Sequence, residues 1–105
     1  MPEEKDFYNV SLKLLLKNDK GEILGLKADP RGTLAGFYDF PGGRINKDEF
    51  HTPFTEILKR EVKEELGDIK FRMTNKPVAI GRHIVSKNPE VRVLLVFFEA
   101  EYLGG

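Results

Sequence analysis

One segment of the sequence, from Thr52 to Gly67, carries both the start and the stop signals of a helix. Thr52 offers a capping hydroxyl, Pro53 follows at the first helical position, and Gly67 supplies a C-terminal cap. We therefore expect a helix from Thr52 to Leu66. At about 100° per residue its apolar side chains gather on one broad arc, which needs a surface to pack against. These side chains are Phe54, Ile57, Leu58, Val62 and Leu66.

The remaining patterns are typical of strands. The expected strands are Val10 to Leu16, Glu22 to Lys27, Phe37 to Phe40, Ile69 to Met73, Val78 to Val85 and Val91 to Glu101. The turn "KNDKGE" joins the first two, which are expected to form a hairpin. The last contains "VLLVFF", a run typical of a central strand buried on both faces. The sequence predicts an α/β fold, a mixed sheet with one long helix packed on one face.

Composition limits the class of protein. The 105 residues suit one domain, 1–105, and 17 basic residues balance 17 acidic ones without a basic stripe, which argues against a nucleic-acid partner. Without cysteine, the chain has no disulfide and no thiolate metal site. Apolar runs such as Leu94 to Phe98 are too short to span a membrane, and the polar start "MPEEKDF" is unlike a signal peptide. We expect a cytoplasmic protein without membrane contact.

The end of the sequence leaves the predicted sheet exposed. The chain stops at "YLGG", directly after the strand predicted to be central. Such a strand needs cover on both faces, and one helix covers only one of them. We therefore expect either a second chain, in a homo-oligomer, or a domain that is truncated at its C-terminus.

Three glutamates of the predicted helix stand in an unfavourable place. Glu61 and Glu65 project within roughly 20° of Phe54, inside the apolar arc, and Glu64 lies at its edge. The last helical turn also carries the negative end of the helix dipole. Crowded, partly desolvated carboxylates have raised pKa values unless a cation is present. The pattern therefore points to a bound cation.

A glycine turn ahead of the helix supports this interpretation. In "PGG", Gly42 and Gly43 allow the backbone to approach a ligand closely. Mg²⁺ takes carboxylate oxygens, waters and substrate phosphates. Together these features suggest a metal-bridged site for a diphosphate. An ordinary solvated helix is the competing interpretation, because Arg60 can pair with Glu56 and Glu64 on the helix surface.

The segment from Gly43 to Ile69 resembles the Nudix box of the Nudix hydrolase family. That box reads Gly, five residues, Glu, seven residues, Arg-Glu, aliphatic, any, Glu-Glu, any, Gly, aliphatic. Its opening is matched by Gly43 and Glu49, and its second half by the ungapped run from Arg60 to Gly67. The lead-in "YDFPGG" is also similar to that of the family. The resemblance implies a Nudix-like mixed sheet with the box helix on one face, and a chain ending before the second covering helix.

The sequence departs from the box in two places. Ten residues, rather than seven, separate Glu49 from Arg60, which lengthens the loop before Thr52. Asp68 and then Ile69 stand where the box has a single aliphatic residue. In addition, the family continues past the end of this chain with a segment that often supplies one more catalytic glutamate.

The resemblance also implies roles for individual residues. Glu61 and Glu65 would be Mg²⁺ or Mn²⁺ ligands, Glu64 a further ligand, and the Gly42 carbonyl would complete the set. Arg60 would hold Glu61 in place by an ion pair. The general base stays open among the glutamates, since it varies within the family.

Three more residues are candidates for substrate contact. Lys27 and Arg44 lie near the expected phosphate region, although solvated strand-end cations are the simpler interpretation of each. Glu49 keeps its box position, and the lengthened loop weakens its assignment to the substrate.

The leading hypothesis for function is a metal-dependent hydrolase that cleaves the diphosphate of a nucleoside diphosphate linked to another group. Its partner would be a nucleotide-type small molecule. Two alternatives come from other classes. One is a non-catalytic Nudix-like module that binds a nucleotide or a protein, and the other is a structural domain whose helix is merely charged. The sequence contains no motif that selects one nucleotide substrate.

Overall fold

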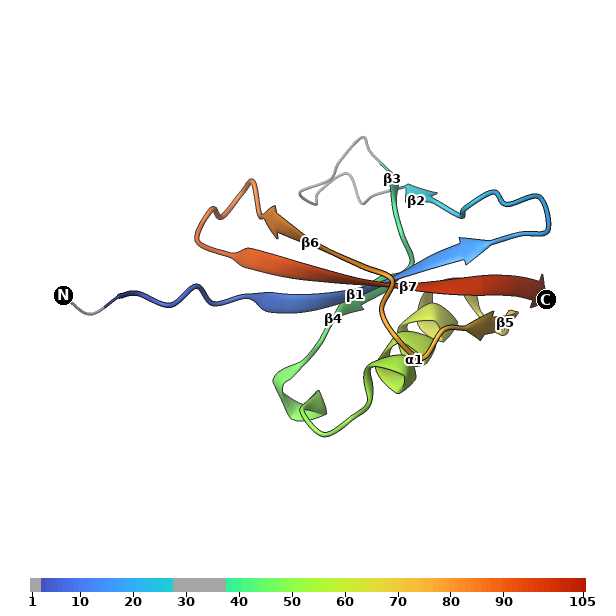
Figure 1. Ribbon diagram of the computed structural model, residues 1–105, viewed down its shortest axis with the longest axis horizontal. Helices are drawn as coiled ribbons and strands as arrows, with labels where there is room; N and C mark the ends of the chain where they lie inside the picture. The colour runs from blue at the N-terminus through green and yellow to red at the C-terminus, as the bar shows by residue number, and fades with distance from the viewer. Residues whose placement is uncertain (1–2, 28–37) are drawn as a thin grey trace.

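The computed structural model describes residues 3–27 and 38–105, and within them one α-helix packs on a mixed sheet (Figure 1). The strands are β1 (Asn9–Lys17), β2 (Leu26–Lys27), β3 (Tyr38–Asp39), β4 (Gly42–Arg44), β5 (Lys70–Met73), β6 (Ala79–Ile84) and β7 (Arg92–Gly104). A 3₁₀ turn, η1 (Lys47–Glu49), precedes the helix α1 (Phe54–Leu66). No helix among the described residues is long and apolar enough to cross a membrane.

The main sheet is built around β1 and β7. These two strands pair in parallel, from Asn9 opposite Val93 to Lys17 opposite Glu101. β4 adds antiparallel to the free edge of β1. β5 and β6 both pair antiparallel with β7, each along a different half of the same edge. The predicted mixed sheet with one helix on one face is confirmed.

Side-chain alternation along β1 decides where the core lies. Successive strand residues point to opposite faces, so alternate leucines of β1 face α1 and are buried to at least 96%. β7 contributes its own alternate residues to the same layer. The buried cluster consists of Leu12, Leu14, Leu16, Ile57, Leu58, Val62, Val96, Phe98 and Ala100. It fixes α1 against the sheet and thereby sets the direction in which the helical glutamates project.

The start of the helix and the first hairpin differ from the prediction. The helix begins at Phe54, with Pro53 as its N-terminal cap residue, and no cap hydrogen bond from a side chain is present there. The predicted capping by Thr52 is therefore wrong, whereas the stop at Gly67, with φ of 80°, is confirmed.

The predicted hairpin partner of β1, Glu22 to Lys27, is reduced to one bridge between Lys17 and Ile23. After that bridge the chain leaves β1, and β2 pairs with β3 in a separate ladder. Alternation of apolar residues in a short segment does not specify which strand it will pair with. Phe37, the start of the predicted strand Phe37 to Phe40, lies outside the described residues.

The prediction that β7 is buried on both faces is wrong for one of them. Val96, Phe98 and Ala100 face α1 and are buried, whereas Leu95 and Phe97 on the other face are only partly covered. Continuous apolar runs predict central position in a sheet, and β7 is central. Burial of the second face depends on a further layer, which a run of apolar residues does not encode.

Candidate metal site

The candidate site begins with two glycines at the edge of the sheet. Gly42 has φ of 140°, and a Cβ atom built there would lie 1.9 Å from the backbone oxygen of Leu12. A Cβ atom at Gly43 would lie 2.7 to 3.0 Å from the carboxylate oxygens of Glu61. Gly42 is therefore required by the backbone itself, and Gly43 leaves the space that a helical carboxylate occupies.

Glu61 and Glu65 converge on these glycines. They are four residues apart on α1 and therefore share one side of the helix. The Glu61 side chain is only 16% exposed and lies against Gly43. Oε1 of Glu65 accepts a hydrogen bond of 3.2 Å from the Gly42 backbone N–H. The structure thus brings together the glycine turn and two of the three acids that the sequence singled out.

The third acid, Glu64, is directed elsewhere. Its carboxylate accepts a 3.1 Å hydrogen bond from Nη1 of Arg60, and its side chain is 59% exposed. Nη2 of the same guanidinium donates to Glu49 at 2.7 Å and to Glu61 at 3.2 Å. Arg60 therefore sits among three carboxylates, and its contact helps to fix the Glu61 side chain. This is the contact that the sequence resemblance implied for Arg60.

The electrostatics around Glu65 favour a cation. Desolvation of its carboxylate is the main cause that raises the Glu65 pKa, and the charges of Glu61 and Asp39 raise it further. The Gly42 hydrogen bond and the charge of Lys13 act in the opposite direction. A positive charge near Glu65 would offset these effects and favour the ionised carboxylate.

Lys13 and Asp39 belong to this neighbourhood, and the sequence interpretation missed both. Nζ of Lys13 lies 2.9 Å from Oδ2 of Asp39, and the lysine side chain is only 12% exposed. Lys13 stands opposite Gly42 in the β1–β4 pairing. The sequence did carry a signal for this pair, since Lys13 is the single lysine inside the apolar stretch "VSLKLLL". A cation that is buried in a strand needs a fixed partner of opposite charge.

The donor atoms fit a hard divalent cation. Among the described residues, no three Asp, Glu or His side chains gather closely enough to hold a metal by themselves. Mg²⁺ does not require that, because it keeps several waters and commonly binds through one or two carboxylates plus substrate phosphates. Glu61 and Glu65 supply two carboxylates beside an open glycine backbone, so the residues present fit Mg²⁺ or Mn²⁺.

The candidate substrate residues are dispersed. Glu49 accepts a 2.9 Å hydrogen bond from the backbone N–H of Asn46 and pairs with Arg60, so it caps η1 and supports the box arginine. Arg44 is exposed on β4 and alternates away from Gly43. The backbone of Lys27 lies in β2, and its side chain lies outside the described part of the chain.

We expect the stability of Glu49→Gln to fall less on acidification than the stability of the wild type. The Asn46 N–H and the Arg60 guanidinium hold the Glu49 pKa below its ordinary value. A lowered folded-state pKa contributes stability that is present above the unfolded-state pKa, about 4.3, and is lost as pH falls through the folded-state value. Thermal melts between pH 7 and pH 3 should therefore show a smaller fall in Tm for Glu49→Gln than for the wild type. An equal fall would show that Glu49 makes no net contribution.

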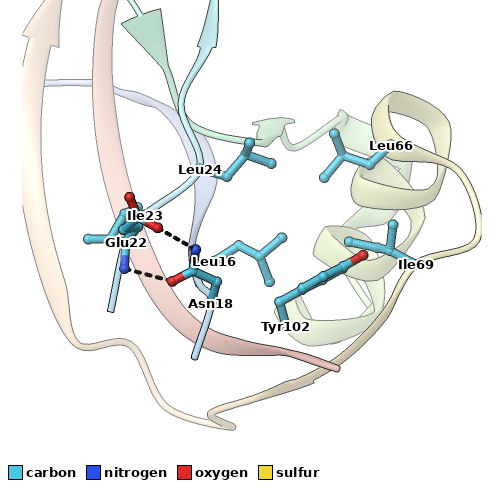
Figure 2. A pocket seen from close by; sticks show the side chains of 8 residues that line it. All are labelled: Leu16, Asn18, Glu22, Ile23, Leu24, Leu66, Ile69 and Tyr102. Carbon is cyan, nitrogen blue, oxygen red and sulfur yellow. Dashed lines mark hydrogen bonds between the residues drawn. The ribbon is translucent and has the colours of Figure 1, made fainter. Parts of the chain in front are cut away.

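A separate pocket of about 510 Å³ lies beyond the C-terminal end of α1 (Figure 2). Side chains of Leu16, Leu24, Leu66, Ile69 and Tyr102 surround its centre. The polar groups at its rim bond within the protein, because the Asn18 side chain pairs with Glu22 and the Tyr102 hydroxyl donates to the Gly105 carbonyl. Among the described residues that line it, this pocket has none of the box glutamates and no cationic side chain to receive a diphosphate.

The sequence matches no protein-family model and no curated protein. Solved structures do match. A MutT protein from Methanosarcina mazei Go1 is 30% identical with a TM-score of 0.70, over 98% of this chain and 67% of that one. A Nudix hydrolase from Nitrosomonas europaea is 22% identical with a TM-score of 0.70, over 93% of this chain and 61% of that one.

A third match, the ORF135 protein of E. coli, is 23% identical with a TM-score of 0.64, over 93% of this chain and 67% of that one. The chain thus spans 61% to 67% of the length of these three proteins. The two matches below 25% identity establish the fold. The match at 30% identity, over nearly all of this chain, establishes the relationship: the chain belongs to the MutT/Nudix hydrolase family.

Proposed function

We propose that this chain is the catalytic part of a metal-dependent pyrophosphohydrolase, which cleaves the diphosphate of a nucleoside diphosphate linked to another group. The observation that carries the proposal is the convergence of Glu61 and Glu65 on the Gly42–Gly43 turn. Family membership supports a hydrolase that acts on a nucleotide-type substrate. Mg²⁺ or Mn²⁺ would be the cofactor.

Each box residue would have a distinct task. Glu61 and Glu65 would hold the cation, and the Gly42 carbonyl would be a third oxygen donor. When bound, the cation would neutralise phosphate charge and make a water molecule more acidic. Arg60 would keep the Glu61 carboxylate oriented through their contact of 3.2 Å.

Glu64 would join as a further ligand only after leaving Arg60. Its side chain is 59% exposed and its ion pair is on the surface, so the contact that must break is worth about 0.5 kcal/mol or less. A cation and a bound diphosphate would more than offset that cost. Arg44 and Lys27 are proposed as outer phosphate contacts. Glu49, which pairs with Arg60, is proposed as a further residue on the substrate side.

The proposal is tested by incubating the chain with a panel of diphosphates, with Mg²⁺, with Mn²⁺ and with EDTA. The panel contains NADH, ADP-ribose, a dinucleoside polyphosphate, a sugar nucleotide and an oxidised nucleoside triphosphate. We expect hydrolysis of at least one compound with metal and none with EDTA. Saturable binding of a nucleotide without hydrolysis at millimolar Mg²⁺ would favour a non-catalytic module instead.

A further inference from the structure

A second polar cluster lies at the N-terminal end of β1, away from the glutamates. Tyr8, Arg82, His83, Ile84 and Arg92 line a pocket of about 260 Å³ there. The strand pairing brings them together. Asn9 stands opposite Val93, which places Tyr8 beside the start of β7. Ile84 stands directly opposite Arg92, which adds the end of β6. Figure 1 shows the N-terminal segment running along the β6–β7 hairpin.

Residues that line this pocket already bind one anionic group of the chain itself, the carboxylate of Asp6. Nη2 of Arg92 donates a 3.1 Å hydrogen bond to Oδ2 of Asp6, and its Nε lies 2.6 Å from Oδ1. The Tyr8 hydroxyl donates to the same carboxylate and accepts a 3.4 Å hydrogen bond from Arg82. Asp6 belongs to the extended segment before β1, and its side chain is 41% exposed. The Asp6 carboxylate is therefore held by side chains alone and lies outside the strand pairing of the sheet.

Two side-chain nitrogens at this pocket are buried without a hydrogen bond. Across the part of the chain that the structure describes, two buried side-chain nitrogens have no hydrogen-bond partner, His83 Nε2 and Arg92 Nε. Both belong to residues that line this pocket. The Arg92 Nε is close to Asp6, but its N–H does not point along a hydrogen bond. Buried polar atoms without partners are rare in proteins and commonly mark a missing ligand or water.

The charge of the pocket is also incompletely balanced. Two guanidinium groups, of Arg82 and Arg92, face a single carboxylate. The Tyr8 hydroxyl and the Arg92 guanidinium hold the Asp6 pKa below its ordinary value, so the environment stabilises negative charge. A phosphate group carries up to two charges and three or four acceptor oxygens, and arginine binds such groups through paired N–H donors.

We propose that Tyr8, Arg82, His83 and Arg92 form a binding site for a phosphate group, and that Asp6 occupies this site until a phosphate displaces it. The site is separate from the candidate metal site. Tyr8 precedes Lys13, the residue opposite Gly42, by five positions, which corresponds to roughly 17 Å along an extended strand. The proposal therefore does not depend on the glutamates or on hydrolysis.

The experiment is a titration of the chain with inorganic phosphate in buffer that contains EDTA, followed by calorimetry and by NMR of the backbone amides. EDTA keeps the candidate metal site from recruiting phosphate. We expect saturable binding, with shifts centred on residues 6–8, 82–84 and 92. Arg92→Gln should weaken binding about 10-fold or more, because charge-assisted hydrogen bonds are lost. Asp6→Asn should strengthen it several-fold, because the competing charge is removed.

Two further variants keep the test decisive. Arg82→Gln affects an exposed residue and should weaken binding even if Arg92→Gln proves unstable in a thermal melt. Arg72→Gln is the charge-matched control, since Arg72 is 76% exposed on β5 and pairs only loosely with Glu101, at 3.8 Å. A parallel titration with AMP identifies the source of the phosphate. Tighter binding of AMP assigns the site to a nucleotide, and equal affinity assigns it to free phosphate.

Three results would overturn the proposal. The first is the absence of saturable binding of either compound. The second is an equal loss of affinity in Arg72→Gln, which would indicate only general attraction to positive charge. The third is unchanged or weaker binding in Asp6→Asn, which would show that Asp6 does not compete for the site.

Discussion

Replacing Glu61 by Gln is expected to reduce metal-dependent hydrolysis by about 100-fold or more, the range found when one electrostatic element of a catalytic site is removed. The amide keeps the size of the side chain, so the fit against Gly43 is preserved. It removes the charge that would hold the cation and that Arg60 now orients at 3.2 Å. The measurement is turnover of whichever diphosphate the panel identifies, at saturating Mg²⁺.

The matched control for this variant is Glu56→Gln. Glu56 lies on the same helix, is exposed, and pairs only loosely with Lys59 at 3.7 Å. It carries the same charge change on the solvated side of α1, so turnover should stay within about two-fold of the wild type. Equal losses in both variants would mean that turnover depends on the overall charge of the helix rather than on the convergence at Gly43.

Gly42→Ala is expected to lower the free energy of unfolding by about 3 kcal/mol or more. Two effects add at this position. The backbone φ of 140° lies in a region that residues with a Cβ rarely adopt, and the new methyl would lie 1.9 Å from the Leu12 oxygen. That oxygen belongs to the backbone of β1, so it cannot move aside as a flexible side chain could. Chemical denaturation measures the loss.

Gly21→Ala separates the two effects. Gly21 also has a positive φ, 79°, but a Cβ atom there would meet nothing within 4 Å. Gly21→Ala should lower the free energy of unfolding by about 1 kcal/mol, because only the left-handed backbone conformation opposes the substitution. If Gly42→Ala were no more damaging than Gly21→Ala, the close approach of β4 to β1 would not be a constraint on this fold.

Local signals in the sequence predict the helix and its buried face well. The apolar residues of α1 repeat at the helical period, and Gly67 ends the helix as expected. The position of Glu61 and Glu65 also follows, because residues four apart share one side of a helix. The pair between Arg60 and Glu64 was also open from the sequence, because the two residues are four apart on the helix. The contact of Arg60 with Glu49 was not, because it depends on the path of the chain before the helix.

Contacts between segments that are distant in the sequence could not be predicted from local sequence patterns. The pairing of β1 with β7 joins residues more than 80 positions apart. The pairing of β1 with β4 places Lys13 opposite Gly42, and the ion pair with Asp39 adds a third segment. The pairings of β7 with β1 and with β6 gather Tyr8, Arg82 and Arg92 at the N-terminal end of β1. A charged residue in an apolar strand can be recognised from sequence, but its partner is fixed only by strand order and register.

The most direct test of the account is the binding of Mn²⁺, followed by NMR, because a bound paramagnetic ion broadens the signals of nearby amides. Substoichiometric Mn²⁺ should broaden the amides of Gly42, Gly43 and residues 61–65 first, and excess Mg²⁺ should restore them. In Glu65→Gln this selective broadening should be lost. Broadening spread evenly over the surface acids, or unchanged in Glu65→Gln, would contradict a metal site built on the glycine turn and the helical glutamates.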